Sequence, residues 1–274
     1  MEKTLDAYFG RESRTDRPAL EDATGRQFDA HWLRTTAWKA GNFLRHTGVR
    51  EGVTVGIAGY GPLPTVAFFG TALLEGTTCF DPPRGEAVES LRTLVAPTAN
   101  LETYATYPGL QRIGYGDNPD EPAARHLESG LWSENPSFPP VDIAPDTPLL
   151  VDPPSLTASE PTVYSHQRVL EAANSLVEQW AVGSGDRIGV GTSLGDPRAV
   201  TAGLIVSLLA DAVTVFPGAE TESVDLLVVD GDAEPGGDTT EASTADNYRT
   251  NAVGSLEAGR RVSVDSVHLE PQKR

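Results

Sequence analysis

The order of helical and extended segments most constrains this chain, because the same order occurs twice. An apolar stripe predicts a helix over 30–47 with Asp29 as its N-cap, and residues 53–58 are typical of a buried strand. A second helix over 65–75 and a short strand over 77–80 follow. Strands that alternate with helices predict parallel pairing and the α/β class.

The second occurrence begins at Ser165, which can cap a helix over 166–180. A strand over 187–191, a helix that runs from Pro197 to residue 210 and a strand over 212–216 follow it. A shared spacing of 135 residues separates His31 from His166, Leu73 from Leu208 and Pro82 from Pro217. The spacing indicates an internal repeat of two similar βαβ-type subdomains, with mainly parallel sheets flanked by helices. The alternative is a chance similarity between two unrelated α/β units.

The segments outside the repeat have weaker patterns. We predict a helix over 86–95, a strand over 112–115 and a strand over 224–229. Residues 231–247 are acidic, rich in glycine and short of apolar side chains, which is typical of disordered segments.

These patterns divide the chain into three parts. Residues 1–140 are expected to hold the first α/β subdomain with its connector, and residues 141–230 the second α/β subdomain. Residues 231–274 are expected to form an acidic, flexible tail.

The charge balance restricts the partners that the chain can have. Asp and Glu number 39 against 21 Lys and Arg, for a net charge of −18, which disfavours nucleic acids and anionic membranes. The only lysines are Lys3, Lys39 and Lys273. Acidic excess with scarce lysine indicates a high-salt cytoplasm, where the repulsion between carboxylates is screened; the alternative is an acidic domain with an acidic tail. No apolar stretch is long enough to span a bilayer and the N-terminus lacks a signal region, so we expect a cytoplasmic protein.

Several short motifs resemble the large N-terminal domain of adenylate-forming enzymes, the family that includes acyl-CoA synthetases. Pro18-Ala19-Leu20, Gly48-Val49, Gly52, Gly70 and Asp81-Pro82 stand where that family's pattern has them. The resemblance covers roughly residues 15–217. It implies a domain of two similar α/β subdomains, which would account for the repeat.

The family binds the phosphates of ATP with a loop of the form [ST]-S-G-T-T-G-x-P-K-G. The corresponding segment here is 154–162, Pro-Ser-Leu-Thr-Ala-Ser-Glu-Pro-Thr. The resemblance therefore implies Ser155, Thr157 and Ser159 as the candidate cofactor-binding residues. ATP and magnesium are expected as cofactors only if this altered loop still binds phosphate.

The departures from the family loop all disfavour phosphate binding. Leu156 and Ser159 stand where the family has glycines, and a side chain at Leu156 occupies space that the backbone needs to approach phosphate. Thr162 stands where the family has its lysine, and Glu160 adds negative charge. The family's Thr-Glu signature, ribose aspartate and lysine-bearing C-terminal domain are not found in the 274 residues, so no catalytic residue is predicted.

Three functions remain open from the sequence. The first is a catalytically inactive binding or regulatory relative of the acyl-CoA synthetases. The second is a half-length adenylate-forming ligase that a partner chain completes, and the third is a protein-interaction module that binds a protein partner or associates with itself.

Other candidate residues have plainer explanations. Cys79 lies in an apolar strand and is expected to be a packed core thiol, and His31 and His166 begin equivalent helices, where capping or packing explains them. Asp225, Asp230 and Asp232 cluster near one strand, which allows a magnesium site, although an acidic composition alone produces such clusters. No metal ligand is therefore predicted.

Overall fold

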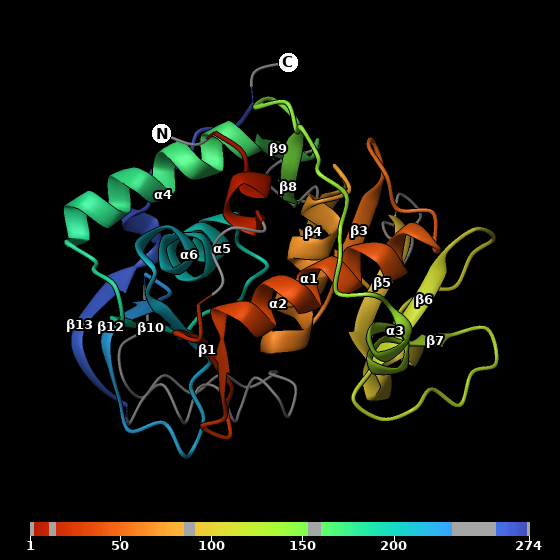
Figure 1. Ribbon diagram of the computed structural model, residues 1–274, viewed down its shortest axis with the longest axis horizontal. Helices are drawn as coiled ribbons and strands as arrows, with labels where there is room; N and C mark the ends of the chain where they lie inside the picture. Colours follow the sequence, from red (N-terminus) through yellow and green to blue (C-terminus); the bar gives the residue numbers. More distant parts are fainter. Residues whose placement is uncertain (1–2, 11–14, 85–90, 153–159, 232–255, 273–274) are drawn as a thin grey trace.

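The computed structural model describes residues 3–10, 15–84, 91–152, 160–231 and 256–272. Its strands form two mainly parallel sheets with helices packed against them (Figure 1). The strands of the first sheet are β3 (Thr54–Ile57), β4 (Thr77–Phe80), β5 (Leu91–Pro97), β6 (Gln111–Tyr115), β7 (Arg125–His126), β8 (Pro148–Asp152) and β9 (Thr162–Ser165). The strands of the second sheet are β1 (Pro18–Glu21), β2 (Gln27–Asp29), β10 (Arg187–Val190), β11 (Val213–Val215), β12 (Ser223–Val229) and β13 (Glu257–Ser263).

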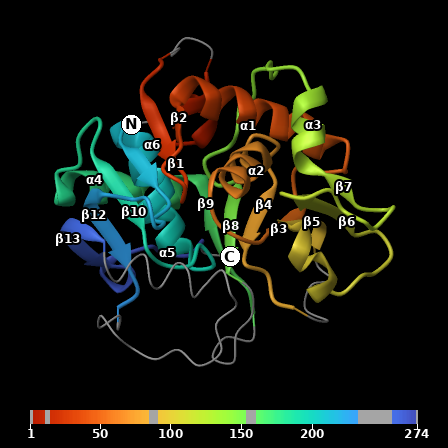
Figure 2. The ribbon, with the colours of Figure 1, turned by 90° about the horizontal axis from the view of Figure 1, so that it is seen from below.

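The helices lie between and around the sheets. They are α1 (Ala30–Arg45), α2 (Pro62–Ala72), α3 (Leu127–Ser133), α4 (His166–Trp180), α5 (Pro197–Val200) and α6 (Val206–Ala210), with a π-helical turn over Thr201–Ile205 that joins α5 to α6. Figure 1 and Figure 2 both show α1 and α2 between the part that holds β10, β12 and β13 and the part that holds β5, β6 and β7. Every described helix falls short of the length and apolarity that a membrane crossing requires.

The internal repeat is visible in the order of the strands. Within the described residues, the first sheet has the order β7-β6-β5-β3-β4-β8-β9 and the second has the order β13-β12-β10-β11-β1-β2. The run β6-β5-β3-β4-β8-β9 of the first sheet corresponds, position by position, to the run β13-β12-β10-β11-β1-β2 of the second. Asp29 caps α1 by accepting from the Trp32 N–H at 2.6 Å, and Ser165 caps α4 by accepting from the Arg168 N–H at 3.4 Å. The predicted α/β class and both predicted N-caps are confirmed.

Each half of the repeat places its first hairpin in the sheet of the other half. The hairpin of β1 and β2 joins the second sheet, where Leu20 pairs in parallel with Thr214. The hairpin of β8 and β9 joins the first sheet, where Leu150 pairs in parallel with Thr78. The predicted boundary at residue 140 therefore does not separate two independent sheets, because strands from either side of it complete both.

The tail expected over 231–274 is ordered in its described part, residues 256–272. There β13 pairs in parallel with β12 along its length, with Ser223 opposite Glu257 and Val229 opposite Ser263. Further along, the Gln272 N–H donates to the carbonyl oxygen of Val163 at 2.7 Å. The expectation of a flexible tail is corrected for these residues, because β13 fills the sheet position that β6 fills in the first half. Residues 232–255 lie outside the described residues.

The predicted helix over 86–95 is corrected for residues 91–95, and residues 86–90 lie outside the described residues. Residues 91–97 form β5, which pairs in parallel with β3 on one side and with β6 on the other. Leu91 and residues 93–96 are buried. A parallel strand that is buried on both faces of the sheet, as residues 93–96 are, shows no clean alternation of apolar and polar residues, so its pattern is easily read as helical.

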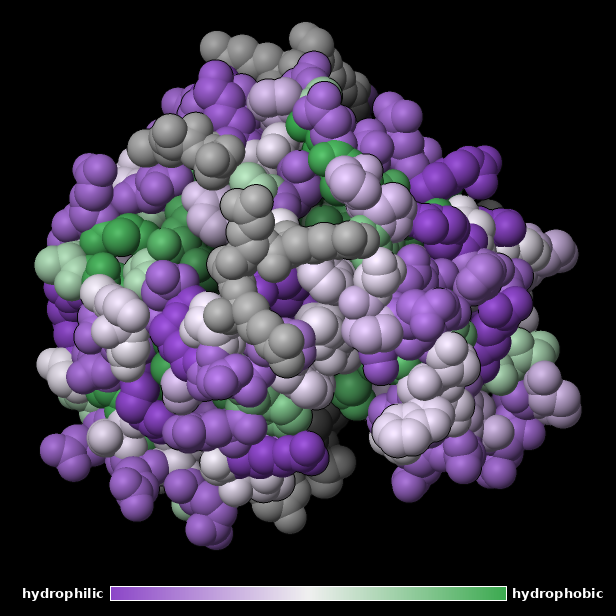
Figure 3. Space-filling model, in the orientation of Figure 1, coloured by the Kyte–Doolittle hydropathy of each residue, from purple (hydrophilic) through white to green (hydrophobic). Residues whose placement is uncertain are grey.

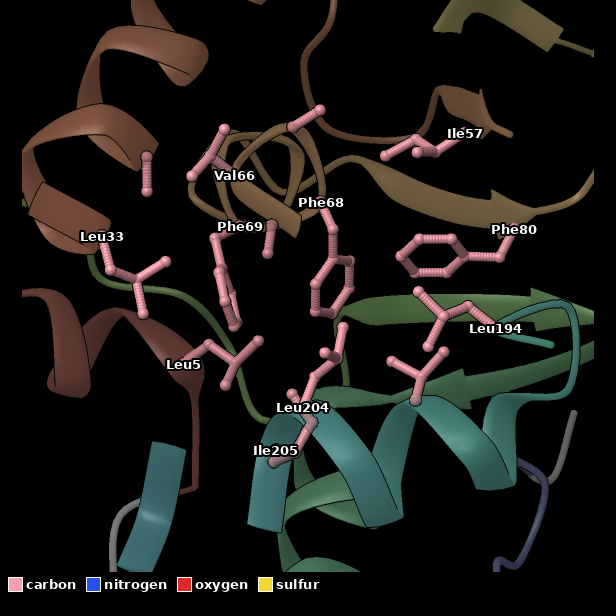
Figure 4. Close-up of a cluster of buried hydrophobic side chains, with 14 of the residues drawn as sticks. Leu5, Leu33, Ile57, Val66, Phe68, Phe69, Phe80, Leu194, Leu204 and Ile205 are labelled. Atoms are coloured by element: carbon pink, nitrogen blue, oxygen red, sulfur yellow. The ribbon is translucent and has the colours of Figure 1, made fainter. Parts of the chain in front are cut away.

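The core joins the two halves through α2. Gly41 of α1 and Gly70 of α2 allow these helices to touch, because a Cβ atom at Gly70 would lie 2.6 Å from the backbone nitrogen of Gly41. On its other side, α2 presents Phe68 and Phe69, both almost fully buried, toward Leu204 (Figure 4). The aromatic side chains of α2 therefore bridge the two halves.

Candidate functional site

Strand ends from the two sheets meet at one place. Asp81 follows β4 and Ser193 follows β10, and the Ser193 hydroxyl donates to Asp81 Oδ2 at 2.6 Å. Tyr60 follows β3, and its hydroxyl donates to the carbonyl oxygen of Val190 at 2.6 Å. The carboxyl ends of parallel strands are where α/β proteins bind ligands. We call this place, formed by Tyr60, Asp81, Asp152, Ser193, Asp196 and Arg198, the strand-end junction.

Asp81 braces the junction. Its backbone is in the left-handed region, with φ of 43°, and its Oδ1 accepts from the Gly59 N–H at 3.2 Å. Gly59 itself has φ of 99°, and a Cβ atom at this position would collide with the Tyr115 hydroxyl. That hydroxyl donates to the carbonyl oxygen of Ala58 at 2.9 Å. Burial raises the pKa of Tyr115, so this phenol stays protonated and keeps donating. Asp81 Oδ1 thus joins the ends of β3 and β4 within the first sheet, and Asp81 Oδ2 joins that sheet to the second through Ser193.

The charge at the junction is predominantly negative. The Arg198 guanidinium donates to Asp196 at 2.7 Å and to Asp265 at 2.9 Å, so its positive charge is committed to two carboxylates. Asp152 lies at the end of β8. Burial, and then the negative charge of Asp196, raises the pKa of Asp152, while the positive charge of Arg198 lowers it by less. A polyphosphate placed here would meet the three carboxylates of the junction, with Asp265 beside them, and one guanidinium, which is electrostatically unfavourable.

The predicted loop residues Ser155, Thr157 and Ser159 lie outside the described residues. The hairpin that holds this loop is described: β8 and β9 are antiparallel, and Asp152 is the partner of Thr162. Because β8 runs parallel to β4, its carboxyl end lies at the same edge of the sheet as Asp81. Thr162, which stands where the family has its lysine, is a strand residue here.

Two of the other candidate residues are buried, as predicted. Cys79 is 3% exposed, and burial, followed by the charges of Asp152 and Asp81, raises the pKa of its thiol to about 12. His166 is fully buried, and its Nδ1 accepts from the Leu5 N–H at 3.2 Å. Both fill packed positions, as the sequence suggests.

The acidic residues near β12 do not form one cluster. Asp225 lies near the start of the strand and accepts from the Arg187 N–H at 2.8 Å. Asp230 follows the end of the strand and accepts from the Thr192 hydroxyl, and Asp232 lies outside the described residues. Within the described part of the chain, no group of three or more His, Cys, Asp or Glu side chains is arranged to hold a metal ion.

Sequence reasoning missed the two contacts that build the junction. Asp81 and Ser193 are 112 residues apart, and Tyr60 and Val190 are 130 residues apart. Asp81 does belong to the Asp81-Pro82 motif that matches the family pattern. Its bond to Ser193 has no sequence signal, because it depends on how the two halves pack.

The comparisons with known proteins identify the fold. No model of a known protein family matches the chain, and no curated protein matches it in sequence. The structure is similar to ATP-bound MatB from Rhodopseudomonas palustris, with a TM-score of 0.67, 16% identity and coverage of 83% of this chain and 49% of MatB. It is similar to the anthranilate CoA ligase AuaEII in complex with anthranoyl-AMP, with a TM-score of 0.69, 18% identity and coverage of 84% and 51%.

A third similar structure is the N-terminal domain of FACL13 from Mycobacterium tuberculosis, with a TM-score of 0.64 and 16% identity. That match covers 78% of this chain and 59% of the FACL13 chain. The chain thus spans about half the length of the ligases it matches. Its two sheets and their helices have the fold of the N-terminal domain of adenylate-forming enzymes.

Proposed function

We propose that the chain is a non-catalytic relative of the acyl-CoA synthetases, a binding or regulatory module that does not form adenylates. The observation that carries this proposal is the charge of the strand-end junction. Asp152, Asp196 and Asp265 lie around one guanidinium that two of them already engage. Adenylation needs positive charge or hydrogen-bond donors at the reacting phosphate. This junction supplies an excess of carboxylates instead.

The sequence of the loop supports the same proposal. Leu156 replaces a glycine of the family loop and Thr162 replaces its lysine, so both backbone approach and positive charge are lost. Glu160, next to β9, is exposed and adds a further carboxylate at this edge. The loop and its surroundings therefore repel phosphate together.

The test is calorimetric titration of the purified chain with ATP and magnesium in concentrated potassium chloride, together with an assay for pyrophosphate release. We expect no saturable heat and no pyrophosphate. Saturable, ATP-dependent adenylate formation would overturn the proposal, and micromolar ATP binding without turnover would favour the ligase that a partner chain completes.

A pair of double variants tests the electrostatic reason. Asp152→Asn with Asp196→Asn removes two negative charges from the junction, and we expect this variant to bind ATP more tightly than the natural sequence. Asp142→Asn with Asp146→Asn changes the net charge equally at exposed positions outside the junction, and is expected to have no effect. Equal responses of the two double variants would show that the junction carboxylates are not the barrier.

A protein-interaction role is supported by one surface residue. Trp132 of α3 is 88% exposed and is the large hydrophobic side chain that stands out as exposed among the described residues. The face of the molecule in Figure 3 is mostly hydrophilic, with smaller hydrophobic areas. Tryptophan is enriched at the centres of protein interfaces. Light scattering on the natural chain and on Trp132→Gln tests this role. If both proteins have the mass of a monomer at all concentrations, self-association is excluded.

A further inference from the structure

A cavity of about 320 Å³ lies between the two halves of the molecule. Its walls come from the 3-10 helix η1 (Leu5–Phe9), from β1, α1 and α2, and from α6 with the start of β11. It shares no residue with the strand-end junction, so an inference about it is independent of the proposed function. Its size is near the lower end of the range, roughly 300–1,000 Å³, of small-molecule sites, which occur often between subdomains.

Apolar side chains outnumber polar ones in the cavity wall. Phe9, Leu33, Phe69 and Leu204 line it, and Figure 4 shows the last three converging from α1, α2 and the π-helical turn. Such a wall favours the compact apolar part of a ligand and disfavours a small, fully hydrated ion.

The polar side of the cavity is positively charged. Arg17, Arg34 and Asp211 line it, so two guanidinium groups face one carboxylate in a chain whose net charge is −18. Arg34 is only 7% exposed, whereas Arg17 and Asp211 form an ion pair with side chains 26% and 59% exposed. Burial, and then the charge of Arg17, lowers the pKa of Arg34.

Two hydroxyl groups in the wall donate to one backbone carbonyl oxygen. Ser207 donates to Gly203 O at 2.7 Å and Thr214 donates to the same oxygen at 3.2 Å. Arg17 and Arg34 are the lining side chains whose positive charge can discriminate a ligand, and Arg17 is also engaged by Asp211. A guanidinium is planar and presents paired N–H donors that match a carboxylate.

We propose that this cavity binds a small organic monocarboxylate. Its carboxylate lies against Arg34 and Arg17, and its apolar part lies against Phe9, Phe69 and Leu204. The ligand is limited by the volume to about the size of a single aromatic ring or a short aliphatic chain.

The test uses sodium benzoate as the probe, with calorimetry and saturation-transfer NMR as readouts. We expect saturable benzoate binding that weakens by at least about tenfold in Arg34→Met, because a hydrogen bond between charged groups is lost. Arg168→Met is the matched control: it removes an arginine from the first turn of α4, outside the cavity, and should leave benzoate affinity unchanged. Benzamide, which has the same shape without the charge, should bind more weakly than benzoate.

Four outcomes would overturn the proposal. They are no saturable benzoate binding, equal affinity for benzamide and benzoate, full affinity in Arg34→Met, and tighter binding of inorganic phosphate than of benzoate. If Arg34→Met does not fold, Arg17→Gln at the more exposed rim replaces it, and is expected to weaken benzoate binding as well.

Discussion

The buried imidazole of His166 makes stability depend on pH in a defined direction. Burial lowers the pKa of His166 from 6.5 to about 4. Its Nδ1 accepts the Leu5 N–H, so protonation at this nitrogen would break the bond that ties the N-terminal segment to α4. Well above pH 6.5 the imidazole is neutral in both the folded and the unfolded chain, so its titration does not change the stability there.

Between the two pKa values the unfolded chain binds a proton that the folded chain does not. Stability is therefore lost as the pH falls from 6.5 toward 4, by about 3 kcal/mol over the whole interval. Below about pH 4 this contribution becomes constant.

The assay is urea unfolding at constant salt between pH 8 and pH 4, for the natural chain and for His166→Gln. The variant cannot titrate at this position, while its amide oxygen can still accept the Leu5 N–H. Carboxylates titrate in both proteins, so the difference between the two pH profiles isolates His166. Parallel profiles, or an imidazole that titrates near pH 6.5 by NMR in the folded chain, would refute the reasoning.

Three further predictions concern the packing and the charge. Glu21→Gln should lower the free energy of unfolding in urea by about 3–5 kcal/mol, because Glu21 of β1 is 4% exposed and its two carboxylate oxygens accept from Arg187 of β10 at 2.8 Å. A loss within about 0.5 kcal/mol, the range typical of surface substitutions, would contradict this role. Gly70→Ala should destabilise by about 1–3 kcal/mol, because its Cβ would meet Gly41, whereas Gly183→Ala, whose Cβ meets nothing closer than 3.8 Å, is the control. Raising the potassium chloride concentration from about 0.1 M to about 1 M shortens the screening length roughly threefold and weakens the repulsion within a chain of net charge −18, so the melting temperature should rise. A melting temperature that falls or stays constant would argue against high-salt adaptation.

Much of the local structure follows from the sequence. Thr77–Phe80 is a strand with the predicted bounds, and α1 and α4 begin at the predicted caps Asp29 and Ser165. These features depend on residues three or four positions apart, or on a single capping side chain, so a linear pattern contains them. The repeat is also present in the sequence, because both halves need the same helix and strand signals in the same order.

The candidate site was only partly predictable. The Asp81-Pro82 motif and the segment 154–162 were found through the family pattern, and the structure shows that Asp81 and the end of β8 share one edge of a sheet. The charge of the junction was not predicted. It comes from Asp152, from the neighbouring residues Asp196 and Arg198, and from Asp265, which lies 67 residues after Arg198 and meets it when β13 joins the second sheet.

The sequence by itself determined the α/β class, the repeat and most element positions, because those depend on contacts within one helix or strand. Only the tertiary structure decided that the hairpins of the two halves change places, that residues 257–263 form a strand and that residues 91–97 are not helical. The neighbour of a strand is set by burial and by hydrogen bonding with other segments, and for β1 that segment, β11, is more than a hundred residues away. The pattern of β1 is compatible with any parallel partner, and its pairing with β11 is set by the packing of both halves around α2.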